Sequence, residues 1–205
     1  MNKLFVCVLF CFFLLNCSSG NKGSQPLVFA AASLHDALTE IEDQYRLEHG
    51  KSVKFSFGGS TNLARQISSY GAPADGVIFA GLQPLSILIN AGKISGNDVT
   101  EILKNRLVVV WGKESRNLGS FQDLAFAGGK IAVADKNLAP AGDYSYDALH
   151  NGGVYDLVKN RLIPLSNVRS ALNTVLSGNS DYGIVYSSDL NTIRTEYDFI
   201  LIPQE

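Results

Sequence analysis

Cysteine is absent from most of the sequence. The 205-residue chain has three cysteines, at positions 7, 11 and 17, and none from Ser18 onward. Disulfide bonds, cysteine catalysis and thiolate-bound metal ions are therefore excluded from the body of the protein.

The sequence also lacks an excess of charge of either sign. It has 17 Lys and Arg against 19 Asp and Glu, a net charge of −2. The basic residues are scattered and form no basic stripe, so we expect no nucleic-acid partner. Hydrophobic residues make up 46% of the chain and charged residues 18%. This composition is typical of a globular protein with a substantial core.

The N-terminal apolar run is too short to span a membrane. Residues 4–15, LFVCVLFCFFLL, follow Lys3 and carry no charge. A membrane-spanning helix needs about 20 such residues, whereas this length fits the apolar region of a secretory signal. We therefore expect residues 1–16 to be a signal peptide that is cleaved before Cys17.

The sequence LLNCSSG around this point resembles a bacterial lipoprotein signal, although Asn16 stands where a small residue is usual. The resemblance implies that Cys17 carries lipid and anchors the protein at the periplasmic or outer face of the cell envelope. Residues 17–26 would then form a flexible polar tether. The alternative is an ordinary signal peptide with an incidental cysteine.

Strand and helix patterns alternate after the tether. Strands are predicted at 28–30, 53–57, 76–80, 107–111, 131–134, 182–186 and 199–202. Helices are predicted at 34–45, 63–70, 84–91, 144–150, 154–159 and 168–176, with a further short helix within 120–129. This alternation predicts an α/β fold with mainly parallel sheets. In such folds ligands bind beyond the carboxyl ends of strands, where helices begin.

Four predicted strand-to-helix junctions share one chemistry. Each offers small or hydroxyl-bearing residues where a helix exposes unpaired N–H groups, which favour an anion. Their sequences are AAAS at 30–33, FGGSTN at 57–62, APAGD at 139–143 and LSNV at 165–168. Helix capping explains any one of these serines or asparagines equally well. Capping does not explain three alanines in a row or the pair Gly58-Gly59.

Tyr186 ends a predicted strand, so its hydroxyl can reach a ligand at the same edge. A buried core tyrosine is the alternative interpretation. Four helix N-termini that meet at one point would hold a small dianion without any lysine or arginine.

Several motifs, taken together and in their order along the chain, resemble those of the molybdate-binding proteins of bacterial ABC transporters. The resemblance runs from residue 27 to residue 205 and rests on FAAASL, FGGSTNLARQI, GAPAD, LVVV, PAGDY, NVRSAL and GIVYSSD. It implies a type II periplasmic-binding-protein fold, in which two lobes joined by a hinge close over one tetrahedral oxyanion. Residues 27–107 with 193–205 would form the first lobe, and residues 108–192 the second.

The resemblance also implies which groups hold molybdate or tungstate. They are neutral donors that contact the oxygens of the anion and are not direct ligands of the metal. Hydroxyl groups would come from Ser33, Ser60 and Tyr186, and backbone N–H groups from Ala141 and Val168.

Three positions depart from the family pattern. Gly59 stands where some members have another serine. Asp143 lies where an aliphatic residue is usual, and because a carboxylate would repel a dianion we expect it to face solvent. The sequence ends at Glu205, before the last strand and helices that are typical of the family. We therefore expect residues 193–205 to re-enter a first lobe that is incomplete.

The sequence thus predicts a monomeric binding protein, without enzymatic activity or a cofactor, that passes molybdate to a membrane permease. Closure is expected because the anion touches more donors in the closed state. A binding protein for sulfate or phosphate is one alternative, and a truncated lipoprotein that binds nothing is another.

A hydrolase using Ser33 or Ser60 is the third alternative. It finds little support, because His35, His49 and His150 show no arrangement of base and orienting group. The sequence also has no G-x-S-x-G motif.

Overall fold

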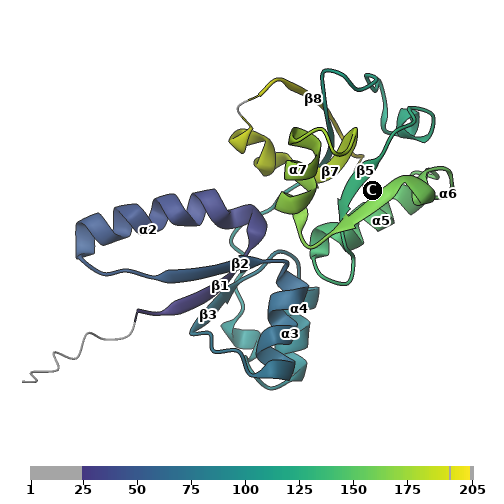
Figure 1. Cartoon of the computed structure of the whole chain (residues 1–205). Helices are drawn as coiled ribbons and strands as arrows, with labels where there is room; N and C mark the ends of the chain where they lie inside the picture. Colours follow the sequence, from purple (N-terminus) through teal and green to yellow (C-terminus); the bar gives the residue numbers. More distant parts are fainter. Residues whose placement is uncertain (1–24, 194, 204–205) are drawn as a thin grey trace, which may run out of the picture.

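The computed structural model describes residues 25–193 and 195–203, which form two β-sheets (Figure 1). The smaller sheet is parallel, with the order β2–β1–β3, and consists of β1 (Leu27–Ala31), β2 (Lys54–Gly58) and β3 (Gly76–Ile78). The larger sheet has the order β6–β5–β7–β4–β8. Its strands are β4 (Leu107–Gly112), β5 (Ile131–Ala134), β6 (Leu162–Leu165), β7 (Tyr182–Tyr186) and β8 (Tyr197–Leu201). The expected signal peptide and Cys17 lie outside the described residues.

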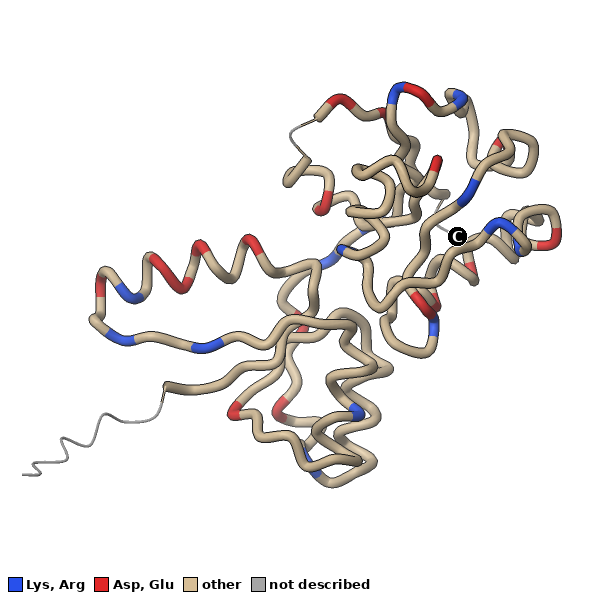
Figure 2. Tube along the Cα trace, in the orientation of Figure 1, with Lys and Arg blue, Asp and Glu red and all other residues tan. Residues whose placement is uncertain are grey.

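The small lobe consists of β1–β3 and the helices that follow them. After β1, the 3₁₀ turn η2 (Ala32–Leu34) leads into α2 (His35–His49); α3 (Ser60–Tyr70) follows β2, and α4 (Gln83–Asn90) follows β3. α3 and α4 pack on one face of the sheet. α2 lies on the other side and extends beyond it (Figure 1), with acidic positions spaced along its length (Figure 2). The buried cluster of this lobe is Phe29, Leu63, Ala64, Ile67 and Leu88.

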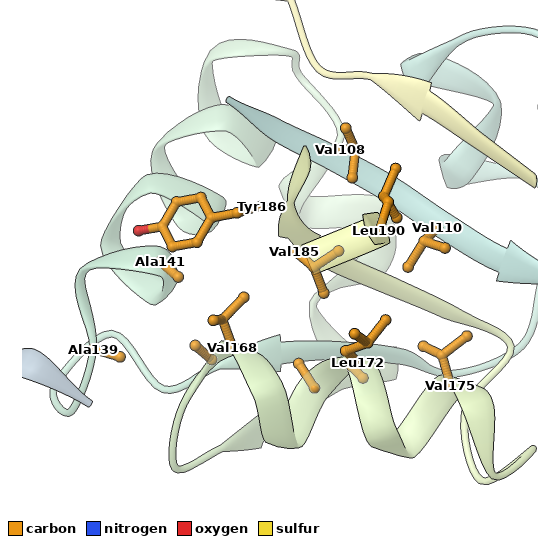
Figure 3. Close-up of a cluster of buried hydrophobic side chains, with 13 residues drawn as sticks. Val108, Val110, Ala139, Ala141, Val168, Leu172, Val175, Val185, Tyr186 and Leu190 are labelled. Carbon is orange, nitrogen blue, oxygen red and sulfur yellow. The ribbon is translucent and has the colours of Figure 1, made fainter. Parts of the chain in front are cut away.

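The large lobe consists of β4–β8 with α5 (Pro140–Asn151), α6 (Tyr155–Val158) and α7 (Val168–Leu176). Successive side chains of a strand point to opposite faces of the sheet. Val108 and Val110 of β4 therefore join the cluster on the α7 side, which Figure 3 shows, and Val109 and Trp111 join the cluster on the other side. The central strands read as continuous apolar runs because both faces are covered.

The predicted α/β fold is confirmed, but the larger sheet is mixed. β4 runs antiparallel to both β7 and β8, while β5 runs parallel to β6 and β7. β6 was not predicted, because Pro164 interrupts the strand pattern of LIPL. A proline is tolerated there because β6 is an edge strand and pairs only with β5.

The C-terminal strand lies in a different lobe from the one expected. Residues 193–205 were expected in the first lobe, but β8 pairs with β4 in the larger sheet, with Val109 opposite Ile200. Ile202, just after β8, is buried against the cluster that contains Trp111. β8 thus gives β4 a second neighbouring strand in the large lobe, and Ile202 adds an apolar contact there.

Other differences concern the ends of elements. The short helix expected within 120–129 is the 3₁₀ turn η4 (Phe121–Ala125). α5 begins at Pro140, earlier than expected, because proline fits the first turn of a helix. Within the described part of the chain, no helix combines the length and the apolar character needed to cross a membrane.

Candidate functional site

A cleft with an empty volume of about 220 Å³ lies where the two lobes meet. All five predicted site residues line it, so the structure brings the four junctions together. None of the described lining residues is charged. The small lobe supplies Ala31, Ala32, Ser33, Gly58, Gly59, Ser60 and Ala80, and the large lobe supplies Ala139, Pro140, Ala141, Asn167, Val168 and Tyr186.

On the small-lobe side, two strands end at the cleft and two serines follow them. Ser33 lies in η2, directly after β1, and is half-buried. Ser60 opens α3 and is buried, and its Oγ accepts a hydrogen bond from the backbone N–H of Ala80 at 3.1 Å. Because a hydroxyl both accepts and donates, this bond orients Ser60 and leaves its proton free to be donated to a ligand.

On the large-lobe side, two helices begin at the cleft. α5 starts after Ala139, which is extended, and α7 starts after Asn167, whose side-chain oxygen accepts from the N–H of Ser170 at 3.0 Å. Ala141 and Val168 lie in the first turns, where backbone N–H groups have no preceding helical carbonyl to bond. These buried positions are therefore suited to donate backbone N–H groups to a ligand.

Tyr186 is the last residue of β7 and is buried. Burial, with smaller contributions from Tyr144 and Asp189, raises the pKa of its phenol above the usual value. The hydroxyl therefore keeps its proton and remains a hydrogen-bond donor. Figure 3 shows the phenol oxygen at the same end of the lobe as Ala139 and Ala141.

The lobes also touch through hydrogen bonds to two backbone carbonyls of the large lobe. The backbone N–H of Asn62 donates to the carbonyl of Leu138 at 3.0 Å, and the side-chain Nη1 of Arg65 donates to the carbonyl of Asn137 at 2.7 Å. A side-chain Cβ at Gly59 would lie 2.4 Å from the Leu138 oxygen. Glycine at this position therefore permits the close approach of the two lobes.

An ion cluster next to the cleft could not be predicted from the sequence. Arg169 lies 2.8 Å from Asp36 and 2.9 Å from Asp189. Asp189 is fully buried, and burial raises the pKa of its carboxyl to about 6, although Arg169 and the N–H of Tyr186 act in the opposite direction. The pKa of Asp36 is lowered, chiefly by its hydrogen bond to His35. The motif NVRSAL contains Arg169, but nothing local to it identifies its partners.

Asp143 does not line the cleft. It lies in the first turn of α5 and is half-buried, so it is less exposed than the solvent-facing position expected. Partial burial, and then the nearby carboxylate of Asp147, raise the pKa of its carboxyl.

The donors in the cleft suit an anion better than a cation. None of His35, His49 and His150 is among the residues that line the cleft. Within residues 25–193 and 195–203, no group of three or more histidines, cysteines and carboxylates is placed to hold a metal ion.

A family model described as bacterial extracellular solute-binding protein matches residues 26–205. The molybdate-binding protein ModA of Escherichia coli strain K12 is 38% identical over 168 residues, which are 79% of this chain and 65% of that protein. The putative ABC transporter substrate-binding lipoprotein YvgL of Bacillus subtilis strain 168 is 33% identical over 196 residues, 91% of this chain and 75% of that protein. The chain thus spans about two thirds of the first relative and three quarters of the second.

Solved structures share the fold. The substrate-binding domain of a putative molybdenum ABC transporter from Clostridium difficile has a TM-score of 0.58 at 30% identity, covering 87% of this chain and 77% of that one. The Azotobacter vinelandii periplasmic molybdate-binding protein has a TM-score of 0.69 at 22% identity, covering 84% and 78%. The Mycobacterium tuberculosis sulfate-binding protein SubI has a TM-score of 0.70 at 19% identity, covering 88% and 71%. These likenesses confirm the predicted two-lobed fold class.

Proposed function

The chain belongs to the bacterial extracellular solute-binding proteins, and we propose that it captures molybdate or tungstate in the cleft and delivers it to the permease of an ABC transporter. The main support is that five neutral donor positions from both lobes line one cleft whose described lining carries no charge. A relative named as a molybdate-binding protein and a solved structure named as part of a putative molybdenum ABC transporter support the choice of anion.

The donor set fits an anion that carries no proton. Ser33, Ser60 and Tyr186 offer hydroxyl protons, and Ala141 and Val168 offer backbone N–H groups. A protonated phosphate would need an acceptor for its own proton, which a buried carboxylate provides best. The described lining contains no carboxylate, so phosphate is disfavoured.

Sulfate is the second candidate, because the fold is shared with a sulfate-binding protein. Sulfate and molybdate are both tetrahedral dianions, so the size of the closed cleft must distinguish them. A smaller anion would leave some buried donors unpaired, which costs binding energy.

Capture follows from the way in which the donors are divided between the lobes. Because Ser33 and Ser60 lie on one lobe and the other three positions on the other, an anion that contacts both sets favours the closed state. On this proposal the protein is a monomeric carrier without enzymatic activity. It acts outside the cytoplasm, where lipid on Cys17 would anchor it to the membrane.

Calorimetric titration with molybdate, tungstate, sulfate and phosphate tests the proposal. We expect binding of the first two and at least about tenfold weaker binding of sulfate and phosphate. Equal affinity for sulfate would overturn the choice of anion. Absence of heat with all four anions, together with an unchanged melting temperature, would overturn the assignment as an oxyanion carrier.

A further inference from the structure

Arg169 contacts both lobes beside the cleft without lining it. It follows Val168 in the first turn of α7, in the large lobe. Its Nη2 lies 2.8 Å from the Oδ2 of Asp36 and donates to the carbonyl oxygen of Ser33 at 3.5 Å, and both of these residues belong to the small lobe. The side chain therefore reaches the turn that carries one of the proposed anion donors.

The same guanidinium is also linked to Tyr186, through the carboxylate of Asp189. Its Nε lies 2.9 Å from the Oδ1 of Asp189, and its Nη1 donates to Thr192 at 2.9 Å. The other carboxylate oxygen of Asp189 accepts the backbone N–H of Tyr186 at 3.1 Å. Arg169 thus joins Ser33 in the small lobe to Tyr186 in the large lobe through one planar group.

The two carboxylates have different roles because they lie in different lobes. Asp189 and Arg169 belong to the same lobe, so their contact can persist when the lobes separate. The contact with Asp36 exists only while the lobes are together. An interaction present in one state alone shifts the equilibrium towards that state.

We propose that Arg169 is a positioning residue for anion capture, with Asp36 as its partner on the small lobe. In the closed state it sets the Ser33 turn against the end of β7 that carries Tyr186. This proposal rests on the proposed function, because anion retention is the property that it explains.

The test is the dissociation rate of molybdate from Asp36→Asn, measured by stopped flow on the full chain. The side chain of Asp36 is 53% exposed, so we expect the variant to fold. Loss of the cross-lobe pair should make release about three times faster, as expected for a partly exposed ion pair. If Asp36 acted only through its negative charge and not through the pair with Arg169, Asp36→Asn would have the opposite effect. Loss of the charge would then slow the release of a dianion.

Asp43→Asn is the matched control, because Asp43 pairs with Arg46 within α2 at 2.6 Å and does not reach the other lobe. Release should be unchanged in this variant, and Asp36→Glu should restore most of the wild-type rate. Asp36 also lies in the first turn of α2, where a negative charge stabilises the helix. Loss of that stabilisation would affect the free and the molybdate-bound protein equally, so it would leave the rate of release unchanged. Equal release rates in Asp36→Asn and Asp43→Asn would overturn the proposal.

A second measurement separates this proposal from the proposed function. The N–H of Asn62 bonds to Leu138 across the lobes, so its hydrogen exchange reports closure without any ligand. If the wild-type protein bound none of the four anions, the proposed function would fail. The role of Arg169 in joining the lobes would then be tested by this hydrogen exchange alone. Faster exchange in Asp36→Asn than in Asp43→Asn would support the role of Arg169 in joining the lobes, and equal exchange would overturn it.

Discussion

The small and large lobes both supply donors to the cleft, but they bury their sheets to different extents. In the large lobe, clusters of 13 buried residues lie on each side of the sheet, whereas the cluster of the small lobe has five residues on one side. The small lobe therefore depends on α3 and α4 for most of its packing.

The other face of the small sheet is only partly covered. Phe55 and Phe57 of β2 lie opposite Val28 and Ala30 of β1, and both phenylalanines are half-buried. None of the residues of α2, all of which are described, is buried. The helix was predicted from an apolar spacing that includes Ile41, yet Ile41 is 58% exposed.

This difference in packing also separates the two serines of the proposed site. Ser60 lies on the packed side of the small lobe, at the start of α3, whereas Ser33 lies in the turn that leads into α2. The Ser33 side therefore has less support from its own lobe, and Arg169 supplies contacts to it from the large lobe. Three sets of variants test this picture of the two lobes and of the cluster that joins them.

The largest expected effect is on stability. Leu172→Ala removes a side chain of α7 that is 1% exposed, and we expect the free energy of unfolding to fall by about 3 kcal/mol. Ile41→Ala makes a similar truncation on α2 and should change this free energy by less than about 0.5 kcal/mol. Urea unfolding of both variants measures the difference. A comparable loss in Ile41→Ala would mean that α2 is packed in solution and that the contrast between the lobes is wrong.

The next effect is on binding. Ser33→Ala combined with Ser60→Ala removes two hydroxyl donors to a charged ligand, and we expect molybdate to bind about 100-fold more weakly. Ser86→Ala is the control, because this serine of α4 donates to the carbonyl of Leu82 one turn earlier and does not line the cleft. Its affinity should stay within about threefold of the wild type. Calorimetry that finds normal affinity in the double variant would show that the small-lobe donors are wrongly assigned.

The smallest effect is a pH dependence from the buried ion cluster. Burial raises the pKa of Asp189 to about 6, above the value of an exposed aspartate, so the folded state holds a proton that the unfolded state loses. Stability from this group is therefore highest at about pH 4 and below, falls as the pH rises through about 6, and levels off above that. Asp189→Asn cannot lose a proton, but its amide oxygen can still accept the N–H of Tyr186.

The comparison of these two proteins isolates Asp189 from the other groups of the cluster. Arg169 and Asp36 are present in both proteins, so effects that do not depend on residue 189 cancel. Between pH 4 and pH 7 the wild type should lose stability relative to Asp189→Asn by on the order of 1 kcal/mol. A constant difference in urea unfolding across this range would show that the pKa of Asp189 in the folded protein is not raised above its value in the unfolded chain.

The elements that the sequence predicted well are those with local signals. The apolar run LVVVW and the spacing of Val168, Leu172 and Val175 correctly predicted β4 and α7. The small residues at the junctions correctly predicted where chain segments leave the sheets, and all five candidate residues line one cleft. That they bind an anion stays a prediction.

The features that the sequence did not predict depend on contacts between distant segments. β8 offers the same backbone N–H and C=O groups to any free sheet edge, so its sequence did not specify β4 as its partner. Arg169 is separated by more than a hundred residues from Asp36, and an arginine in the first turn of a helix has no local feature that names such a partner.

The sequence by itself thus determined the order of strands and helices and the chemistry of each junction, because hydrophobic period and residue size act within a few residues. Only the tertiary structure decided that the junctions meet in one cleft, that β8 joins the large lobe and that Arg169 spans both lobes. These outcomes follow from which surfaces can be buried together, and that depends on the whole chain.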